Sequence, residues 1–365
     1  LPTVRTAARQ AMRLLGSHFV LGETIDQALV RANSESGRLF RYSFDMLGEG
    51  ARTAVDAKRY LQSYAAAITA IGEAAGNAAL PERPGISVKL SALHPRYEEF
   101  SRARVLRELV PMVVDLAGQA KAFDLNFTVD AEEADRLDLS MAVIARVIAD
   151  PVLKDWDGFG LAIQAYQKRA DAVIGFVSEL AEAHARRLMV RLVKGAYWDT
   201  EIKRAQERGL DDYPVFTRKA MTDLNYLACA RHLLALRPRI YPQFATHNAM
   251  TVAHIVHAAG DGSGYEFQRL HGMGDPLYAT LREIRPDIPC RTYAPVGQHR
   301  DLLAYLVRRL LENGANTSFV SVAADPAIPI EQLVLGEAEI IGDAQAARHP
   351  NIALPRDLYG PSRRN

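Results

Sequence analysis

Short apolar stretches alternate with longer amphipathic stretches along most of the chain. The short ones favour β structure, and the long ones repeat their apolar positions at helical spacing. In residues 53–75, for example, Tyr64, Ile68 and Ile71 fall on one helical face. The predicted strands cover residues 39–45, 86–93, 125–130, 159–164, 188–193, 241–247, 265–271 and 290–296. The predicted helices between them cover about 53–75, 102–121, 137–149, 168–186, 215–235 and 250–258, with a short one after residue 271.

This alternation predicts an α/β fold of the (β/α)8 TIM-barrel type, spanning residues 38–325. A doubly wound open sheet is the alternative, but no G-x-G-x-x-G motif follows any predicted strand. Residues 1–37 are expected to form an N-terminal helical arm, in which Thr24 can cap a helix. Residues 326–365 are expected to form a C-terminal extension and linker.

Polar side chains gather at or just after the carboxyl ends of the predicted strands. In a (β/α)8 barrel these ends meet at the face that carries the active site. Several polar residues converging on one rim therefore predict a functional site. The residues concerned are Lys89, Asp130, Gln164, Lys194, Thr246, His247 and His271.

The stretch 188–199 combines a predicted strand with unusual chemistry. Arg191 interrupts its apolar run, and a buried guanidinium needs a partner inside the fold or a ligand. Lys194 and Gly195 end the strand, and Tyr197 and Trp198 follow with two flat faces. Cations, an open backbone and aromatic rings suit a planar anionic ligand. A buried arginine paired with a core carboxylate explains the same stretch equally well.

The last predicted helix spans residues 301–314. Asp301 can cap it and Gly314 stands where a C-terminal glycine belongs. Arg308 and Arg309 share a side of this helix with Tyr305, amid leucines. Arginines beside so much apolar surface indicate a helix that lies over something, although two solvated arginines on an ordinary barrel helix remain the alternative.

Composition narrows the class of protein. The 365 residues are 48% hydrophobic and 24% charged, which is typical of a globular chain with a large core. A net charge of +1 argues against a nucleic-acid footprint, and two cysteines are too few for a disulfide framework and favour a reducing compartment. No apolar run reaches the length of a membrane span, about 18 residues. The chain begins with Leu, and residues 355–365 are typical of a linker, so we expect a piece of a longer protein.

Other site chemistries fit less well. His254 and His257 lack a third ligand nearby, and His247 with His271 is a better metal pair, but the first predicted strand has no His-x-His. A Schiff base on Lys194 leaves Arg191 and the paired arginines unexplained. The remaining classes are a flavin-type oxidoreductase and a barrel that only binds.

With these residues in view, the chain resembles the proline dehydrogenase module of the bifunctional proline utilisation flavoproteins. The resemblance extends from about residue 20 to the end. Its motifs are Ser87-Val-Lys-Leu-Ser91, Thr128-Val-Asp-Ala-Glu-Glu-Ala-Asp135, Val190-Arg-Leu-Val-Lys-Gly-Ala-Tyr-Trp-Asp199, Gln243-Phe-Ala-Thr-His-Asn248, Leu270-His-Gly-Met-Gly274 and Tyr305-Leu-Val-Arg-Arg-Leu-Leu-Glu-Asn313.

The resemblance implies a distorted barrel whose last helix lies over the C-terminal face. It implies non-covalent FAD and oxidation of L-proline to Δ1-pyrroline-5-carboxylate by hydride transfer to flavin N5, the first step of proline catabolism to glutamate. It also implies a membrane quinone as electron acceptor and an aldehyde dehydrogenase module in the same longer chain. A cytoplasmic location follows, with at most peripheral contact to the inner membrane and no nucleic-acid partner for this part.

The resemblance also assigns roles to individual residues, and none of them is a metal ligand. Asp130 and Arg191 are implied to be catalytic. The implied substrate-binding residues are Lys89, Tyr197, Leu270, Tyr293, Tyr305, Arg308 and Arg309. FAD is implied to contact Ala131, Gln164, Arg191, Lys194, Gly195, Ala196, Trp198, Thr246, His247, Asn248 and Glu312. Glu49 is implied to pair with Arg308 as a gate.

Overall fold

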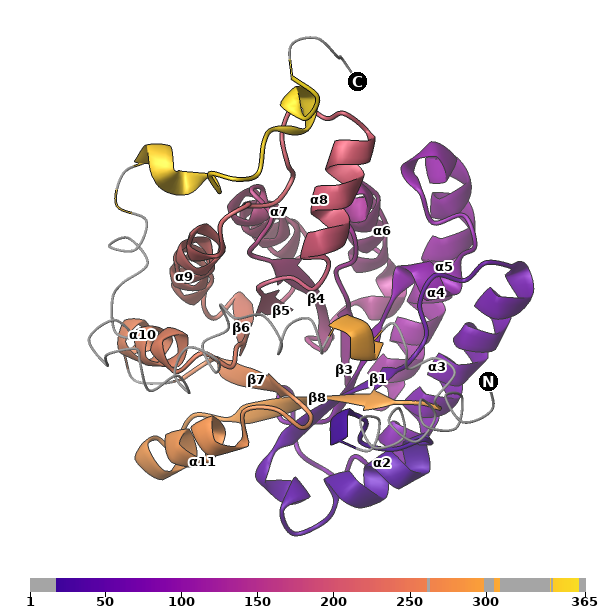
Figure 1. Ribbon diagram of the computed structural model, residues 1–365. Helices are drawn as coiled ribbons and strands as arrows, with labels where there is room; N and C mark the ends of the chain where they lie inside the picture. Colours follow the sequence, from indigo (N-terminus) through magenta and orange to yellow (C-terminus); the bar gives the residue numbers. More distant parts are fainter. Residues whose placement is uncertain (1–17, 261–262, 299–304, 309–341, 343, 361–365) are drawn as a thin grey trace, which may run out of the picture.

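Eight parallel strands close into a barrel in the order β1 to β8, which confirms the predicted (β/α)8 architecture (Figure 1). The structure is a computed structural model and describes residues 18–260, 263–298, 305–308, 342 and 344–360. The strands are β1 (Arg41–Met46), β2 (Gly85–Val88), β3 (Asn126–Val129), β4 (Phe159–Gln164), β5 (Leu188–Val193), β6 (Ile240–Ala245), β7 (Glu266–Leu270) and β8 (Cys290–Val296).

Helices surround the strands in Figure 1 and bury the outer face of the barrel. They are α2 (Ile25–Ala32), α3 (Ala54–Ala74), α4 (Leu90–Leu93), α5 (Arg102–Ala122), α6 (Leu137–Ile148), α7 (Ala170–Ala183), α8 (Trp198–Glu207), α9 (Lys219–Ala235), α10 (Ala249–Ala259) and α11 (Asp275–Ile284). Local signals set several starts: Thr24 caps α2 as predicted, Thr53 forms a capping box with Asp56, and Asn248 caps α10. In the described part of the chain, each helix is too short or too polar to span a lipid bilayer.

The strand predicted over residues 86–93 is shorter than expected. It ends at Val88, and Leu90–Leu93 form a turn of helix instead. A continuous buried apolar run does not distinguish a strand from a helix, and all four residues of this turn are buried. Lys89 precedes this turn and lies at the mouth of the barrel, and Ser91 is part of the turn itself.

Besides the turn α4, a longer helix was also not predicted. The segment α8 lies between β5 and α9 and carries Trp198 at its first position. It is a polar helix whose buried residues are Glu201, Ile202 and Ala205, so its apolar stripe is too narrow to stand out in the sequence. Residues 344–360, yellow in Figure 1, run past α8 and α9, and Ile352 packs on this region.

The interior of the barrel is polar where an apolar core would be usual. Glu266 on β7 is fully buried between Arg291 at 2.6 Å and Arg41 at 3.1 Å. It also accepts hydrogen bonds from the side chains of Gln243 and Gln268. Each buried charge is therefore paired, and the pairing continues through Gln268 toward the mouth of the barrel.

Two segments that are far apart in the sequence, residues 18–22 and 305–308, meet at this mouth. Residues 18–22 cross the end of β8, where the Leu21 amide donates to the Pro295 carbonyl at 2.9 Å. Residues 305–308 are helical, and in Figure 1 this orange turn projects over the strands at the centre of the barrel. Tyr305 and Leu306 are buried there with Phe19, Val20 and Leu47. The remainder of the helix predicted over 301–314, with Asp301 and Gly314, lies outside the described residues.

Candidate active site

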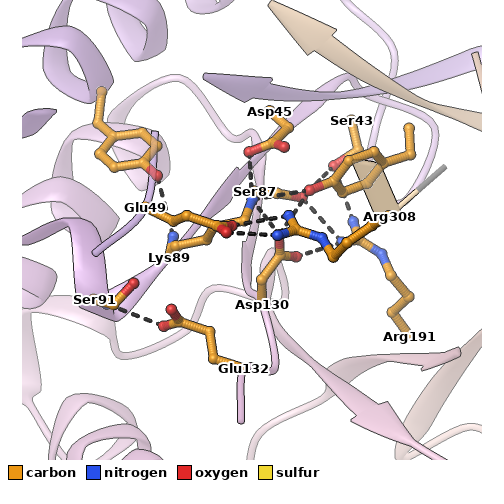
Figure 2. Close-up of polar contacts among 12 residues, drawn as sticks. Ser43, Asp45, Glu49, Ser87, Lys89, Ser91, Asp130, Glu132, Arg191 and Arg308 are labelled. Atoms are coloured by element: carbon orange, nitrogen blue, oxygen red, sulfur yellow. Dashed lines mark hydrogen bonds and ion pairs between the residues drawn. The ribbon is translucent and has the colours of Figure 1, made fainter. Parts of the chain in front are cut away.

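Arg191 is the centre of a buried polar cluster at the carboxyl ends of the strands (Figure 2). Its Nη1 donates to Asp130 Oδ1 at 2.8 Å and to Ser87 Oγ at 3.0 Å. Its Nη2 donates to Ser43 Oγ at 3.0 Å, and its Nε donates to Gln268 Oε1 at 2.7 Å. The guanidinium is thus held by four strands or their ends, with Asp130 as its charged partner. Such a fixed cation is a preorganised source of positive potential.

Lys89 lies beside this pair and bridges two carboxylates. Its Nζ donates to Asp45 Oδ1 at 2.8 Å, to Asp130 Oδ2 at 3.2 Å and to the Tyr293 hydroxyl at 3.2 Å. Tyr293 in turn donates to Asp130 Oδ2 at 2.8 Å. Burial alone would raise the pKa of Asp130, but the charges of Lys89 and Arg191 outweigh it and hold that pKa below its ordinary value. Asp130 is therefore ionised at neutral pH.

The second carboxylate, Asp45, was not among the predicted site residues. Burial raises its pKa above the ordinary value, and the neighbouring charge of Asp130 adds to the rise, although Lys89 opposes it. Its Oδ2 atom is buried without a hydrogen-bond partner among the described residues. The pKa values of the two neighbouring carboxyls, Asp45 and Asp130, are thus shifted in opposite directions by their surroundings.

Arg308 and Glu49 meet above the cluster. Arg308 Nη1 lies 2.6 Å from Glu49 Oε1 and Nη2 lies 2.9 Å from Oε2, which is a two-pronged ion pair. Burial would raise the pKa of Glu49, but the hydrogen bonds and charge of Arg308 lower it. The same guanidinium lies over the Tyr197 ring, 5.0 Å from its centroid. The predicted pair is thus in contact, while Arg309 and Glu312 lie outside the described residues.

The segment after β5 has a backbone that only glycine adopts readily. Gly195 has φ +130°, and a Cβ placed on it would lie 2.6 Å from the ring of Tyr166. Its neighbour Lys194 forms an ion pair with the buried Asp223, which also binds Lys219. The rim is therefore closely packed beneath Gly195 and positively charged beside it, which fits the approach of a phosphate-bearing cofactor to the backbone.

Further predicted cofactor contacts follow β3, β4, β5 and β6 and form one sector of the rim. Trp198 donates its indole N–H to the Phe216 carbonyl at 2.9 Å. His247 Nε2 accepts the Leu270 amide at 3.0 Å, which fixes the ring beside the end of β7. The buried Gln164 ends β4 and accepts from Gln167. Ala131, Ala196, Thr246 and Asn248 complete the sector at the ends of their strands.

His271 was predicted at the rim but does not join the cluster. Burial lowers its pKa to about 4, and the charges of Arg269 and Arg31 add to that fall, while Asp275 opposes it. His254 and His257 lie on α10. Within the described ranges, no group of His, Cys, Asp and Glu side chains is arranged to hold a metal ion.

Several contributors to the cluster were missed in the sequence. On β1, Ser43 and Asp45 are two residues apart, so both lie on the inward face of the strand. On β2, Ser87 stands two residues before Lys89 and shares its inward face. Gln268 is two residues after Glu266 on β7. Polar residues at every second position of otherwise buried strands were the signal that could have identified them.

The closed parallel barrel and the charged cluster at the carboxyl ends of its strands define the class, a (β/α)8 barrel with an enzyme-like site. Comparison with known families is consistent with this class and narrows it. The proline dehydrogenase family profile matches residues 28–322. The chain belongs to the proline dehydrogenase family.

Individual relatives agree with this assignment. The chain is 53% identical over 377 residues to the bifunctional protein PutA of Salmonella typhimurium, with 100% of this chain and 29% of that protein covered. It is 27% identical over 324 residues to a proline dehydrogenase of Deinococcus radiodurans, covering 87% of this chain and 93% of that protein. A crystal structure of Bradyrhizobium japonicum proline utilization A superposes with a TM-score of 0.92 at 71% identity, covering 100% of this chain and 37% of that one. The chain thus spans about a third of the PutA proteins that it matches.

Proposed function

We propose that the chain oxidises L-proline to Δ1-pyrroline-5-carboxylate with FAD as the hydride acceptor. The observation that carries the proposal is the cluster of Arg191, Asp130, Lys89 and Tyr293 beneath Arg308 at one barrel mouth. Family membership supports proline as the substrate. The quinone acceptor, the aldehyde dehydrogenase module of a longer chain and peripheral contact with the inner membrane belong to the same proposal.

Because proline is a small molecule, its carboxylate is the main group by which the protein can bind it. Arg308 offers a guanidinium fork whose position is fixed by Glu49 and the Tyr197 ring. Lys89 adds a second positive charge deeper in the mouth. Arg309, which follows Arg308 in the sequence, is proposed to complete the carboxylate site. Together these cations orient the ring carbon that loses hydride.

The residues proposed to surround the proline ring then stabilise the charge that develops on the substrate during hydride transfer. When hydride leaves the carbon next to the ring nitrogen, positive charge develops on the substrate. The ionised Asp130 lies beside Tyr293 and Lys89 and supplies negative potential there. Tyr293, whose pKa is raised by burial, remains a neutral hydrogen-bonding group that orients Asp130.

The rim sector after β3 to β6 has the donor set and the open backbone for FAD. Lys194, Gly195, Ala196 and Trp198 would hold it after β5. Ala131, Gln164, Thr246, His247 and Asn248 would hold it after the neighbouring strands, with Glu312 added by the resemblance. The flavin supplies the hydride acceptor when bound. Arg191 then provides the fixed cation that favours negative charge at that acceptor.

A spectroscopic experiment tests this function. Purified chain, supplied with FAD, should show a flavin absorption spectrum that L-proline bleaches in the absence of oxygen. Adding a quinone should restore the oxidised spectrum. A chain that binds no FAD, or whose bound flavin stays oxidised with L-proline, would contradict the proposal.

A further inference from the structure

The loop that carries Glu49 is held by hydrogen bonds to a residue outside the ion pair. The Gly50 amide donates to Ser91 Oγ at 2.9 Å, and the Ala51 amide donates to the Ser91 carbonyl at 2.8 Å. Gly50 has φ +61°, so the chain turns sharply directly after Glu49. Two consecutive amides anchored to one residue fix the direction in which the Glu49 side chain leaves the loop.

Ser91 is itself held from a third segment. Its amide donates to Glu132 Oε1 at 3.0 Å, as Figure 2 shows. Glu132 is buried in the loop after β3, two residues beyond Asp130, and its other oxygen lies 3.5 Å from Arg136. A chain of contacts therefore leads from Glu132 through Ser91 to the loop of Glu49, and from there to Arg308.

We propose that Glu132 and Ser91 are positioning residues that hold Glu49 in register for its ion pair with Arg308, and thereby control binding of the substrate carboxylate. This inference rests on the proposed function, in which Arg308 grips that carboxylate. Neither positioning residue needs to touch the substrate. Their action passes through the backbone of Gly50 and Ala51.

The geometry explains why a remote contact can matter. The pair between Arg308 and Glu49 uses both guanidinium nitrogens and both carboxylate oxygens, so it tolerates little movement of either backbone. Glu49 is carried by a loop, and a loop loosened at Gly50 can shift by the small distance that breaks one prong. Arg308 would then hold its substrate-binding position for a smaller fraction of the time.

Hydrogen exchange tests the first link without any ligand. In Ser91→Ala and Glu132→Ala, the Gly50 amide should exchange faster than in the native chain, by about three- to tenfold for one lost hydrogen bond. Glu132→Gln keeps an acceptor oxygen and should restore most of the protection. Glu133→Ala is the matched control, because Glu133 binds Arg136 and Arg204 but makes no contact with Ser91. Ser91→Ala leaves the buried carboxylate intact, so the test does not depend on whether Glu132→Ala folds.

Ligand release tests the second link. Cyclopentanecarboxylate, which cannot lose hydride next to a ring nitrogen, should perturb the flavin spectrum of the FAD-loaded chain. It should dissociate about three- to tenfold faster from Ser91→Ala and Glu132→Ala, while neutral cyclopentylmethanol should show no such change. In a double-mutant cycle with Glu49→Gln, the second change should have little further effect, because it acts through Glu49.

Three results would overturn the inference. The first is native exchange of the Gly50 amide in Ser91→Ala, with or without ligand. The second is faster exchange with unchanged release of cyclopentanecarboxylate, because Ser91 and Glu132 would then serve stability alone. The third is release effects that add to those of Glu49→Gln, because the two residues would then not act through Glu49. A native chain that neither binds FAD nor responds to the carboxylate would instead overturn the proposed function, and the exchange of Gly50 would still decide the coupling.

Discussion

Arg191 on β5 and Asp130, directly after β3, form an ion pair of 2.8 Å at the barrel mouth, where their side chains are only 3% and 10% exposed. Without Asp130 the buried Arg191 would lose its carboxylate partner, and without Arg191 the carboxylate of Asp130 would keep only Lys89. Lys89 extends the pair to a second carboxylate, Asp45. Substitutions in this cluster should therefore affect both stability and chemistry, and separate measurements of unfolding and of flavin reduction distinguish the two effects.

Replacing the central cation tests its role in chemistry. Arg191→Met should lower the flavin reduction potential and slow reduction by L-proline about 100- to 1,000-fold, because one preorganised group that stabilises developing negative charge is lost. Much of the FAD binding should survive. Arg191→Lys keeps the charge and should retain more of the potential. Dye-equilibration measurements of the potential and anaerobic rapid mixing report the two quantities, and native values in a folded, FAD-loaded Arg191→Met chain would exclude the role.

Removing the bridging cation tests the stability of the cluster. Lys89→Met leaves Asp45 and Asp130 side by side without their shared partner, so the free energy of unfolding should fall by about 3–5 kcal/mol. Adding Asp45→Asn removes one of the two carboxylates and should recover part of that loss. Urea unfolding at pH 7 compares the three chains. A double variant no more stable than Lys89→Met would show that repulsion between the carboxylates is not the cause.

The arginines of the last helix are predicted to recognise the substrate carboxylate. Arg308→Met and Arg309→Met should each weaken proline binding about 10- to 100-fold, since a charge-assisted contact contributes about 1.5–3 kcal/mol. The flavin spectrum should barely change. Arg208→Met is a suitable control, because Arg208, which directly follows α8, makes an exposed pair with Asp135 in the segment after β3. Native affinity for cyclopentanecarboxylate in both variants would assign the two arginines to the surface instead.

The sequence predicted the barrel because every strand is a short buried run and most helices carry a broad apolar stripe. It failed where local composition is ambiguous. Leu90–Leu93 is apolar enough for a strand but forms a helical turn, and α8 is too polar to be recognised as a helix. The period-2 placement of Asp45 and Ser43 was present in the sequence but was overlooked.

The site was predictable as a rim but not as a set of contacts. The ends of the predicted strands identified Lys89 and Asp130, and the interrupted apolar run of residues 188–193 identified Arg191. Which carboxylate pairs with which cation depends on rotamers and on the closure of the barrel, which bring β1 beside β8. The contact between Glu132 and Ser91 joins the loop after β3 to the helical turn α4, and no local sequence pattern indicates it.

Glu132 should make stability depend on pH. Burial raises the pKa of its carboxyl to about 7, so the folded chain holds that proton more tightly than the unfolded chain does, where the pKa is near 4.5. Its contribution therefore favours folding below pH 4.5 and is lost as the pH rises through about 7, by at most about 3 kcal/mol. Glu132→Gln lacks this titration. Its free energy of unfolding should therefore rise, relative to that of the native chain, as the pH increases from 4.5 to about 7.

Denaturant unfolding at several pH values measures this difference. Glu133→Gln retains the Glu132 carboxyl and should keep the native slope, although Glu133 shares Arg136 with it. A difference between native and Glu132→Gln that stays constant from pH 4 to pH 8 would mean that the pKa of Glu132 is the same in the folded and the unfolded chain, and that burial does not raise it.

Gly195 should be intolerant of a side chain. Its φ of +130° lies where L-residues are strained, and a methyl group would contact the Tyr166 ring at 2.6 Å. Gly195→Ala can relieve both problems only by moving the backbone between Lys194 and Ala196, which is the part of the rim proposed to approach FAD. A strain of about 1–3 kcal/mol corresponds to roughly 5- to 150-fold in FAD affinity if the loop must be restored on binding.

Gly175→Ala provides the comparison, because Gly175 lies within α7, where a Cβ meets no atom within 4 Å. Alanine is the better helix former, so this change should stabilise the chain by about 0.5–1 kcal/mol and leave FAD binding unchanged. Titration of the unliganded chains with FAD, followed by flavin fluorescence, distinguishes the two sites. If Gly195→Ala binds FAD as tightly as Gly175→Ala does, the cofactor does not depend on the backbone at residue 195, and the proposed FAD sector has to be moved away from the end of β5.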